Sequence, residues 1–192
     1  MADKDASLLA KPASFKPNIT SAHEVVIDRP MSTVFPMLAH GDTMEKSVRL
    51  SDLCTDFQLL KRDNVRLPGS DTLSKSHTRT LPASEDGSGL PRQYFRLEET
   101  VPLIFGLTRK VEITGTLTWD DDAKVSLYET SADQGILIWK LREFEEFEEG
   151  GMTKTKVRET IEGRCPTWLR LIVQKETSRS HRAHMDAYRT LF

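Results

Sequence analysis

Apolar and polar residues alternate through most of the stretch from Gln93 to Ile161. A period of two is typical of β-strands with one buried face and one solvated face. Turn-forming sequences interrupt the alternation at Phe105-Gly106, Asp120-Asp121-Asp122, Asp133-Gln134-Gly135 and Glu149-Gly150-Gly151. The pattern therefore predicts consecutive antiparallel hairpins that share one apolar side.

The alternation also assigns each residue to a face of this sheet. The side with most of the apolar residues is expected to point inward, because it must be covered. Its members in chain order are Phe95, Leu97, Glu99, Val101, Val111, Ile113, Gly115, Leu117, Trp119, Val125, Leu127, Glu129, Leu137, Trp139, Leu141, Glu143, Val157, Glu159 and Ile161.

The stretch from Pro166 to Leu191 contains no further Gly or Pro and predicts a helix. About 25 residues would give a length of about 37 Å. Its start is apolar, with Trp168, Leu169 and Ile172, but the same face continues through Thr177, Ser180 or His181, His184 and Tyr188. A helix that only filled a core would carry Leu or Ile there, so the polar middle indicates a ligand cavity beneath the helix.

The first half of the chain is less regular. Residues 1–21 are expected to form a flexible arm, and residues 22–192 a single domain of the α+β class. A strand over 22–29, two short helices beginning near Ser32 and Asp42, and a strand over 53–60 are predicted. Residues 61–91 are rich in Ser, Asp, Gly and Pro, and 84–89 are expected to be an exposed loop.

Composition excludes several classes of function. A formal net charge of −2 gives no reason to expect nucleic acid as a partner. Cys54 and Cys165 have no metal or redox spacing, and no apolar run approaches the ~20 residues of a spanning helix. The N-terminus lacks the features of a secretion signal. We therefore expect a cytoplasmic monomer or homodimer with no metal and no cofactor.

The element order, together with Ile27-Asp28-Arg29-Pro30 and with Glu159-Thr160-Ile161-Glu162-Gly163 leading into Pro166, resembles the helix-grip superfamily. This group, also called START-like or SRPBCC, includes lipid-transfer domains, birch-pollen-type allergens and bacterial aromatic polyketide cyclases. Val173-Gln174-Lys175 and Ser180-His181 are more loosely similar to fungal domains of unassigned function. The resemblance implies a curved antiparallel sheet of about seven strands wrapped around a long C-terminal helix, with an internal cavity.

Four glutamates lie on the otherwise apolar strand faces: Glu99, Glu129, Glu143 and Glu159. A hairpin centred near Gly150-Gly151 would place Glu143 roughly opposite Glu159, about 5 Å apart at Cβ. Two paired carboxylates in an apolar pocket resist joint ionisation, so one could hold a proton for acid–base chemistry. The alternative is that each glutamate marks the solvated rim of the sheet.

His181 and His184 are neighbours on one flank of the predicted helix. Either imidazole could act as a base or orient a substrate oxygen. The alternative is a histidine that only binds a carboxylate or water. A metal site would need a third ligand, and nothing else has metal spacing.

The expected function is that of a small-molecule cyclase or isomerase, or a dehydratase, acting on a hydrophobic polyketide- or terpenoid-like intermediate of secondary metabolism. The alternative is a non-catalytic binding or transfer protein for a lipid, sterol or other hydrophobic ligand; a protein-interaction role has little support. The catalytic candidates are His184, Glu159, Glu143 and His181. The substrate-binding candidates are Phe95, Leu97, Glu99, Ile113, Trp119, Leu127, Glu129, Trp139, Leu141, Trp168, Ile172, Thr177 and Tyr188.

Overall fold

A computed structural model of the chain describes residues 15–102 and 108–192. It contains a seven-stranded sheet with the order β1-β7-β6-β5-β4-β3-β2, and every neighbouring pair is antiparallel. The strands are β1 (Ile19–Ile27), β2 (Cys54–Val65), β3 (Leu90–Pro102), β4 (Thr108–Asp120), β5 (Val125–Ala132), β6 (Ile136–Glu149) and β7 (Met152–Arg164). The expected fold class is confirmed.

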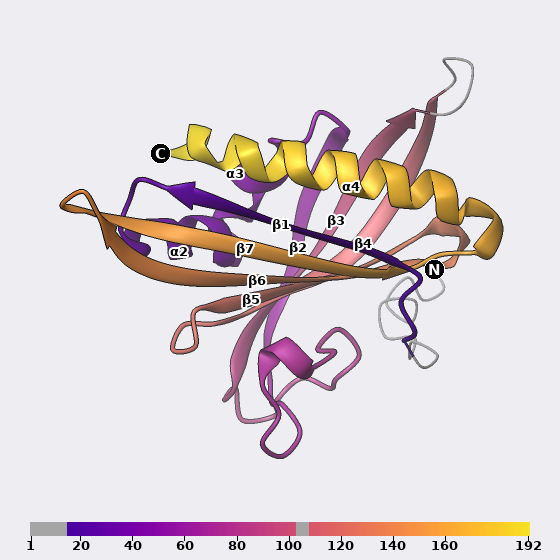
Figure 1. Cartoon of the computed structure of the whole chain (residues 1–192). Helices are drawn as coiled ribbons and strands as arrows, with labels where there is room; N and C mark the ends of the chain where they lie inside the picture. Colours follow the sequence, from indigo (N-terminus) through magenta and orange to yellow (C-terminus); the bar gives the residue numbers. More distant parts are fainter. Residues whose placement is uncertain (1–14, 103–107) are drawn as a thin grey trace.

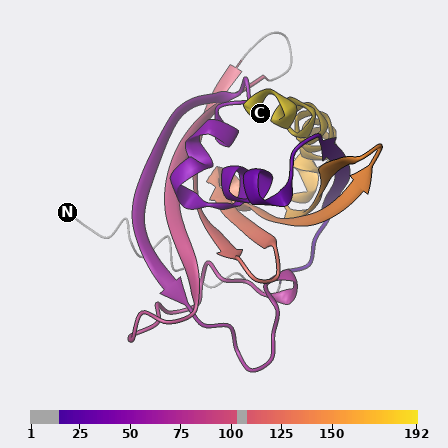
Figure 2. The ribbon, with the colours of Figure 1, turned by 90° about the vertical axis from the view of Figure 1, so that its left-hand side faces the viewer.

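The helices lie on the concave side of this sheet (Figures 1 and 2). Two short helices, α2 (Met31–Ala39) and α3 (Met44–Val48), follow β1, with the 3-10 turn η1 (Gly41–Thr43) between them. The long C-terminal segment comprises η5 (Thr167–Leu169), α4 (Arg170–Ala187) and η6 (Tyr188–Leu191). Figure 1 shows α4 running beside β1, and Gln174 fixes this contact by donating a 2.7 Å hydrogen bond to the Thr20 carbonyl.

The inside of the curved sheet is filled by side chains at one end. Phe35 and Leu38 of α2, Trp119 of β4 and Met185 and Tyr188 at the C-terminal end belong to the main core cluster. Gly115 allows the sheet to pack closely here, because a Cβ at this position would lie 2.6 Å from Phe95 Cζ. Toward the other end of α4 this cluster gives way to a cavity.

A second apolar cluster lies on the opposite, outer face of the sheet. Residues 66–81, here called the outer segment, include the 3-10 turn η2 (Leu73–Lys75). Leu73 of this turn packs against Leu127 and Leu141, and all three are buried. Glu129 holds the outer segment in place, since its carboxylate accepts hydrogen bonds from the backbone N–H groups of Thr78 (2.7 Å) and Arg79 (2.8 Å).

This cluster overturns the predicted faces of two strands. On β5 and β6 the residues expected to point inward, Leu127, Glu129, Leu137, Trp139, Leu141 and Glu143, lie on the outer face, and their neighbours point into the cavity. The cause is the outer segment, which covers the sheet from outside and so allows apolar residues there. The faces predicted for β7 and for Leu97, Glu99, Val111 and Ile113 of β3 and β4 are correct.

The ends of several elements also differ from the expectation. Strand β1 begins at Ile19 rather than Ala22, and β2 continues to Val65 into the region expected to be loop. The turn expected at Phe105-Gly106 lies outside the described residues. Gly150 and Gly151 form the predicted turn, with φ values of 60° and 76°. The division into an arm and a single domain stays a prediction.

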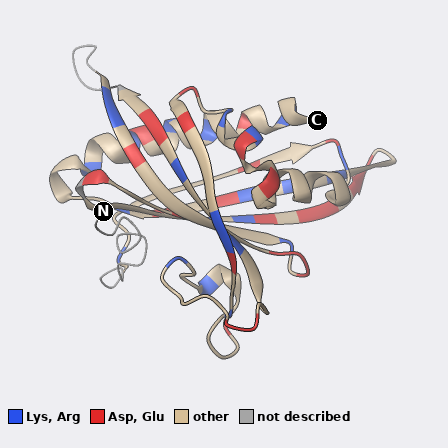
Figure 3. Ribbon diagram, turned by 180° about the vertical axis from the view of Figure 1, so that it is seen from behind, with Lys and Arg blue, Asp and Glu red and all other residues tan. Residues whose placement is uncertain are grey.

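Charged residues of both signs are spread along the strands and helices (Figure 3). The acidic end of β6 is partly neutralised by β7: Lys154 lies 2.9 Å from Glu149, and Lys156 lies 3.2 Å from Glu145. This pairing leaves little support for an acidic interaction patch.

Candidate functional site

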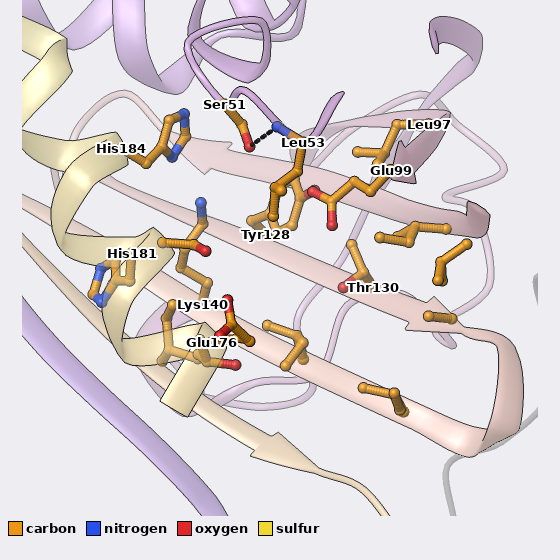
Figure 4. A pocket seen from close by; sticks show the side chains of 18 of the residues that line it. Ser51, Leu53, Leu97, Glu99, Tyr128, Thr130, Lys140, Glu176, His181 and His184 are labelled. Carbon is orange, nitrogen blue, oxygen red and sulfur yellow. Dashed lines mark hydrogen bonds between the residues drawn. The ribbon is translucent and has the colours of Figure 1, made fainter. Parts of the chain in front are cut away.

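A cavity of about 700 Å³ lies between the concave face of the sheet, α3 and α4. Its walls are mainly apolar, with Leu97, Val111, Ile113, Ile138 and Ile161 from the strands and Val173 from the helix. Trp168 lines the cavity and is 74% exposed, so it stands at the opening. A polar group of side chains lies farther along α4 and comprises His181, His184, Lys140 and Tyr128; the His181 ring is turned toward β1 (Figure 4).

Glu159 is fully buried beneath this polar group and is engaged by internal partners. Its Oε1 accepts hydrogen bonds from Arg142 Nε and, at 2.6 Å, from the Tyr188 hydroxyl. Arg142 also donates to the Tyr188 oxygen at 2.6 Å and to the Leu38 carbonyl. Burial alone would raise the pKa of Glu159, but the charges of Arg142 and Lys140 hold it well below the usual value. Glu159 is therefore a fixed anion.

The expected pairing of Glu143 with Glu159 is wrong. Opposite Glu159 stands Arg142, while Glu143 faces Arg158 on the other side of the sheet and is exposed. The two-residue Gly150-Gly151 turn pairs Glu149 with Met152, and counting back from it gives this register. The estimate from sequence was in error by one residue, which moves a side chain to the opposite face.

Lys140 is a cation of β6 whose side chain lines the cavity. Its side chain is 12% exposed, and Nζ lies 3.6 Å from Glu159 Oε2 and 4.5 Å from the centroid of the Tyr128 ring. Burial lowers the pKa of Lys140, and the charge of Glu159 opposes this effect only in part.

His184 reaches the cavity from α4 as a neutral ring. Its Nε2 donates a 2.6 Å hydrogen bond to the Ser47 carbonyl, so Nδ1 carries the lone pair. Burial, reinforced by the charge of Lys140, lowers the pKa of His184 to about 4. The imidazole can therefore accept a hydrogen bond from a ligand at neutral pH.

His181 is bound more tightly to the protein. Its Nδ1 lies 2.9 Å from the Ser21 hydroxyl, and Nε2 lies 3.3 Å from Glu159 Oε2. The second contact is close enough for an ion pair but is not aligned as a hydrogen bond. This ring links β1, β7 and α4.

Glu99 and Tyr128 form the other polar part of the cavity, and Figure 4 shows their side chains beside each other. Burial raises the pKa of Glu99 and, more strongly, that of Tyr128. Glu99 can thus carry a proton closer to neutral pH than an exposed glutamate, and Tyr128 remains an O–H donor.

The remaining substrate-binding candidates divide into three groups. Leu97, Ile113, Ile172 and Thr177 line the cavity, as Glu99 and Trp168 do. Phe95, Trp119 and Tyr188 are buried in the main core. Leu127, Glu129, Trp139 and Leu141 lie on the outer face, where Trp139 donates a 2.9 Å hydrogen bond to the Ser76 carbonyl.

Sequence reasoning missed the polar cavity residues of β5 and β6, which are Ser126, Tyr128, Thr130, Lys140 and Arg142. The register counted back from the Gly150-Gly151 turn could have identified them. It places Arg142 opposite Glu159 and hence Lys140 on the same face. Among the described residues, no group of three or more His, Cys, Asp and Glu side chains is placed to hold a metal ion. None of the described helices is long and apolar enough to cross a membrane.

No protein-family model and no curated protein matches this sequence. Several solved structures match the fold of this chain. An aromatase/cyclase from a Streptomyces species aligns with a TM-score of 0.55 at 14% identity, covering 89% of this chain and 91% of its own. Norcoclaurine synthase from Thalictrum flavum gives 0.57 at 9% identity, covering 90% and 84%. A START superfamily protein from Mycobacterium smegmatis gives 0.50 at 10% identity, covering 90% and 99%.

Structural similarity at such low sequence identity shows the fold and leaves the activity open. The similar structures share the curved sheet, the long C-terminal helix and nearly the whole length of the described chain. The chain therefore has the helix-grip fold.

Proposed function

We propose that this protein is a cofactor-independent cyclase or isomerase that binds a hydrophobic polyketide- or terpenoid-like intermediate. The observation that carries the proposal is an apolar cavity of about 700 Å³ with proton donors and acceptors gathered along one side. This volume is in the range of small-molecule sites, which run from roughly 300 to 1,000 Å³. We further propose a cytoplasmic protein that acts as a monomer or homodimer.

The apolar walls would hold a flexible substrate in a folded conformation and so contribute to the rate through positioning. Glu99 would move the proton, because burial brings its pKa closer to neutral pH. The Tyr128 hydroxyl would donate to a substrate oxygen as negative charge develops on it. His184 would accept a hydrogen bond at Nδ1, since Nε2 is held by Ser47.

Two similar structures support this class of chemistry, since one is an aromatase/cyclase and another is a synthase. These roles replace the earlier assignment to Glu159 and Glu143. Glu159 is held by Arg142 and Tyr188, and Glu143 is on the outer face.

The second candidate is a non-catalytic carrier of a lipid, sterol or similar ligand. The observation that favours it is the extent to which polar groups around the cavity bind one another rather than a ligand, as Glu159, Arg142 and His181 do. Glu99 and Tyr128 would then only anchor the ligand's polar end.

Exchange of the protons next to the carbonyl of an apolar ketone distinguishes the enzyme from the carrier. A long-chain methyl ketone is incubated with the protein in deuterated water, and exchange of the protons next to the carbonyl is followed by NMR. The parent protein is expected to accelerate exchange, and Glu99→Gln to lower the enzymatic rate by about 10²-fold, because it removes the transferring group. The control is Glu112→Gln, which alters an exposed glutamate paired with Arg96 and should exchange at the parent rate.

Ligand binding is measured in parallel by native mass spectrometry, with Ile113→Trp as the variant that fills the cavity. Binding without exchange would favour the carrier. Equal binding by the parent and Ile113→Trp would show that the ligand lies elsewhere and would overturn both candidates.

A further inference from the structure

We propose that Lys140 bonds covalently to the substrate by forming an imine with an aldehyde or ketone carbon held in the cavity. This inference rests on the proposed function, because it assigns carbonyl compounds as the substrate class of the same cavity. It also gives the site a nucleophile, which the sequence did not suggest.

The position of Lys140 satisfies the first requirement, which is access to a bound ligand. Residue 140 lies on the inner face of β6, and Figure 4 shows its side chain extending into the cavity between Tyr128 and the two histidines of α4. The Tyr128 ring lies 4.5 Å from Nζ, so one side of the amine is covered by an aromatic surface. A carbonyl group in the cavity can approach from the opposite side.

The charges around Lys140 satisfy the second requirement, which is an amine that can lose its proton. Two cations share the carboxylate of Glu159: Arg142, which is buried, and Lys140, which is largely buried with a side chain that is 12% exposed. Arg142 has the closer contact and, as a guanidinium, does not deprotonate in proteins. Lys140 is 3.6 Å from the same carboxylate and is the partner that can become neutral.

The other groups that face the Lys140 amine shift its pKa in opposite directions. Burial lowers the pKa of Lys140 and the charge of Arg142 adds to the effect, while Glu159 and Glu99 raise it. His184 adds no charge at neutral pH, because its own pKa is lowered to about 4. Desolvation of this kind is one way in which proteins prepare a lysine for imine chemistry.

The reaction balances without an oxidant or a metal. Neutral Nζ attacks the carbonyl carbon and a carbon–nitrogen bond forms as the carbonyl π bond breaks. One of the two protons on the nitrogen passes to the oxygen, which gives a neutral carbinolamine. The hydroxyl then leaves as water with a proton from the Glu99 carboxyl group, and the nitrogen returns its proton to Glu99. Amine and carbonyl compound thus give imine and water. A protonated imine makes the adjacent carbon more acidic, which would assist enolisation and ring closure.

Borohydride trapping tests the assignment. The protein is incubated near neutral pH with a medium-chain alkyl aldehyde, the imine is reduced to a stable secondary amine, and the modified residue is identified by peptide mass spectrometry. Labelling of Lys140 is expected to be at least ~10-fold faster than labelling of Lys46, which is exposed on α3. Lys140→Arg should lose the internal label, whereas Lys46→Arg should retain it.

Lys140→Met provides a second variant without a charge, and each variant is checked for folding by its denaturant midpoint. Ile113→Trp should also prevent labelling of Lys140, because it fills the cavity and leaves the lysine in place. Absence of a Lys140 adduct, or labelling no faster than at Lys46, overturns the inference.

The ketone exchange and borohydride trapping experiments together distinguish the proposed function from the role of Lys140 as nucleophile. Exchange without an imine adduct would leave the proposed function standing and remove Lys140 as nucleophile. An adduct without exchange would support the covalent bond and overturn the cyclase or isomerase.

Discussion

The buried carboxylate of Glu159 illustrates what single residues do in this protein. Its inward position follows from the alternation along β7, and the structure places it at 0% exposure. Its role could not be predicted in the same way. The role depends on Arg142, 17 residues away in sequence, and on Tyr188 at the end of the helix. A register error of one residue placed Glu143 instead of Arg142 opposite Glu159. The ion pair was therefore predicted as a pair of carboxylates for acid–base chemistry.

Removing the partner of Glu159 should destabilise the fold strongly. Arg142→Met leaves a buried carboxylate without its main counter-charge, and such losses cost roughly 3–5 kcal/mol. The free energy of unfolding in urea would measure the effect. Arg158→Met is the matched control on the neighbouring strand, since its 3.5 Å contact with Glu24 is exposed, and it should change stability by no more than ~0.5 kcal/mol. Equal losses in the two variants would contradict the role assigned to Arg142.

Among the elements, β5 and β6 show the limit of reading faces from alternation. Their apolar residues, such as Leu127 and Leu141, are buried, as the pattern requires, but on the outer side. Alternation gives the two faces of a strand and does not say which face lies toward the helix. The deciding element was the outer segment, whose Ser, Asp, Gly and Pro content predicted a loop and concealed the apolar contact of Leu73.

The outer segment should therefore contribute to stability and not to ligand binding. Leu73 is 1% exposed, and Leu73→Ala is expected to cost about 2–5 kcal/mol in unfolding free energy. Native mass spectrometry with the methyl ketone should show unchanged binding, because the cavity is on the opposite face of the sheet. Leu60→Ala serves as the control, because Leu60 is 37% exposed. Loss of ligand binding in Leu73→Ala at full stability would contradict this separation of the two faces.

At the scale of the whole molecule, the space enclosed by the sheet is packed at one end and hollow at the other. The end beneath α2 is packed with Phe35, Trp119 and Met185, and the space between the sheet, α3 and the start of α4 is hollow. The sequence indicated this difference through the polar middle of the C-terminal helix. Element order could be predicted because it depends on local pattern, and the resemblance that it carries implied the helix-grip fold. The lining of the cavity depended on the register between strands, which the alternation of apolar and polar residues does not determine.

The polar side of the cavity should make global stability sensitive to acid. The unfolded chain binds a proton at His184 near its ordinary pKa of 6.5, whereas the folded protein keeps this ring neutral down to about 4. Acid therefore favours unfolding across this interval, and stability is lost as the pH falls. The loss attributable to His184 is about 2 kcal/mol between about pH 7 and pH 5. Glu159 contributes at lower pH, below its ordinary value of 4.5.

His184→Gln should reduce this acid sensitivity, because the amide can still donate to the Ser47 carbonyl but takes up no proton. Urea unfolding at both pH values measures the difference. His77 provides a control of opposite sign, since its hydrogen bond to Glu129 raises its pKa despite burial. It stabilises the fold below 6.5 and loses this effect as the pH rises, so His77→Gln should increase the acid sensitivity. If His184→Gln and the parent lost equal stability, His184 would not be the neutral, buried ring that the site requires.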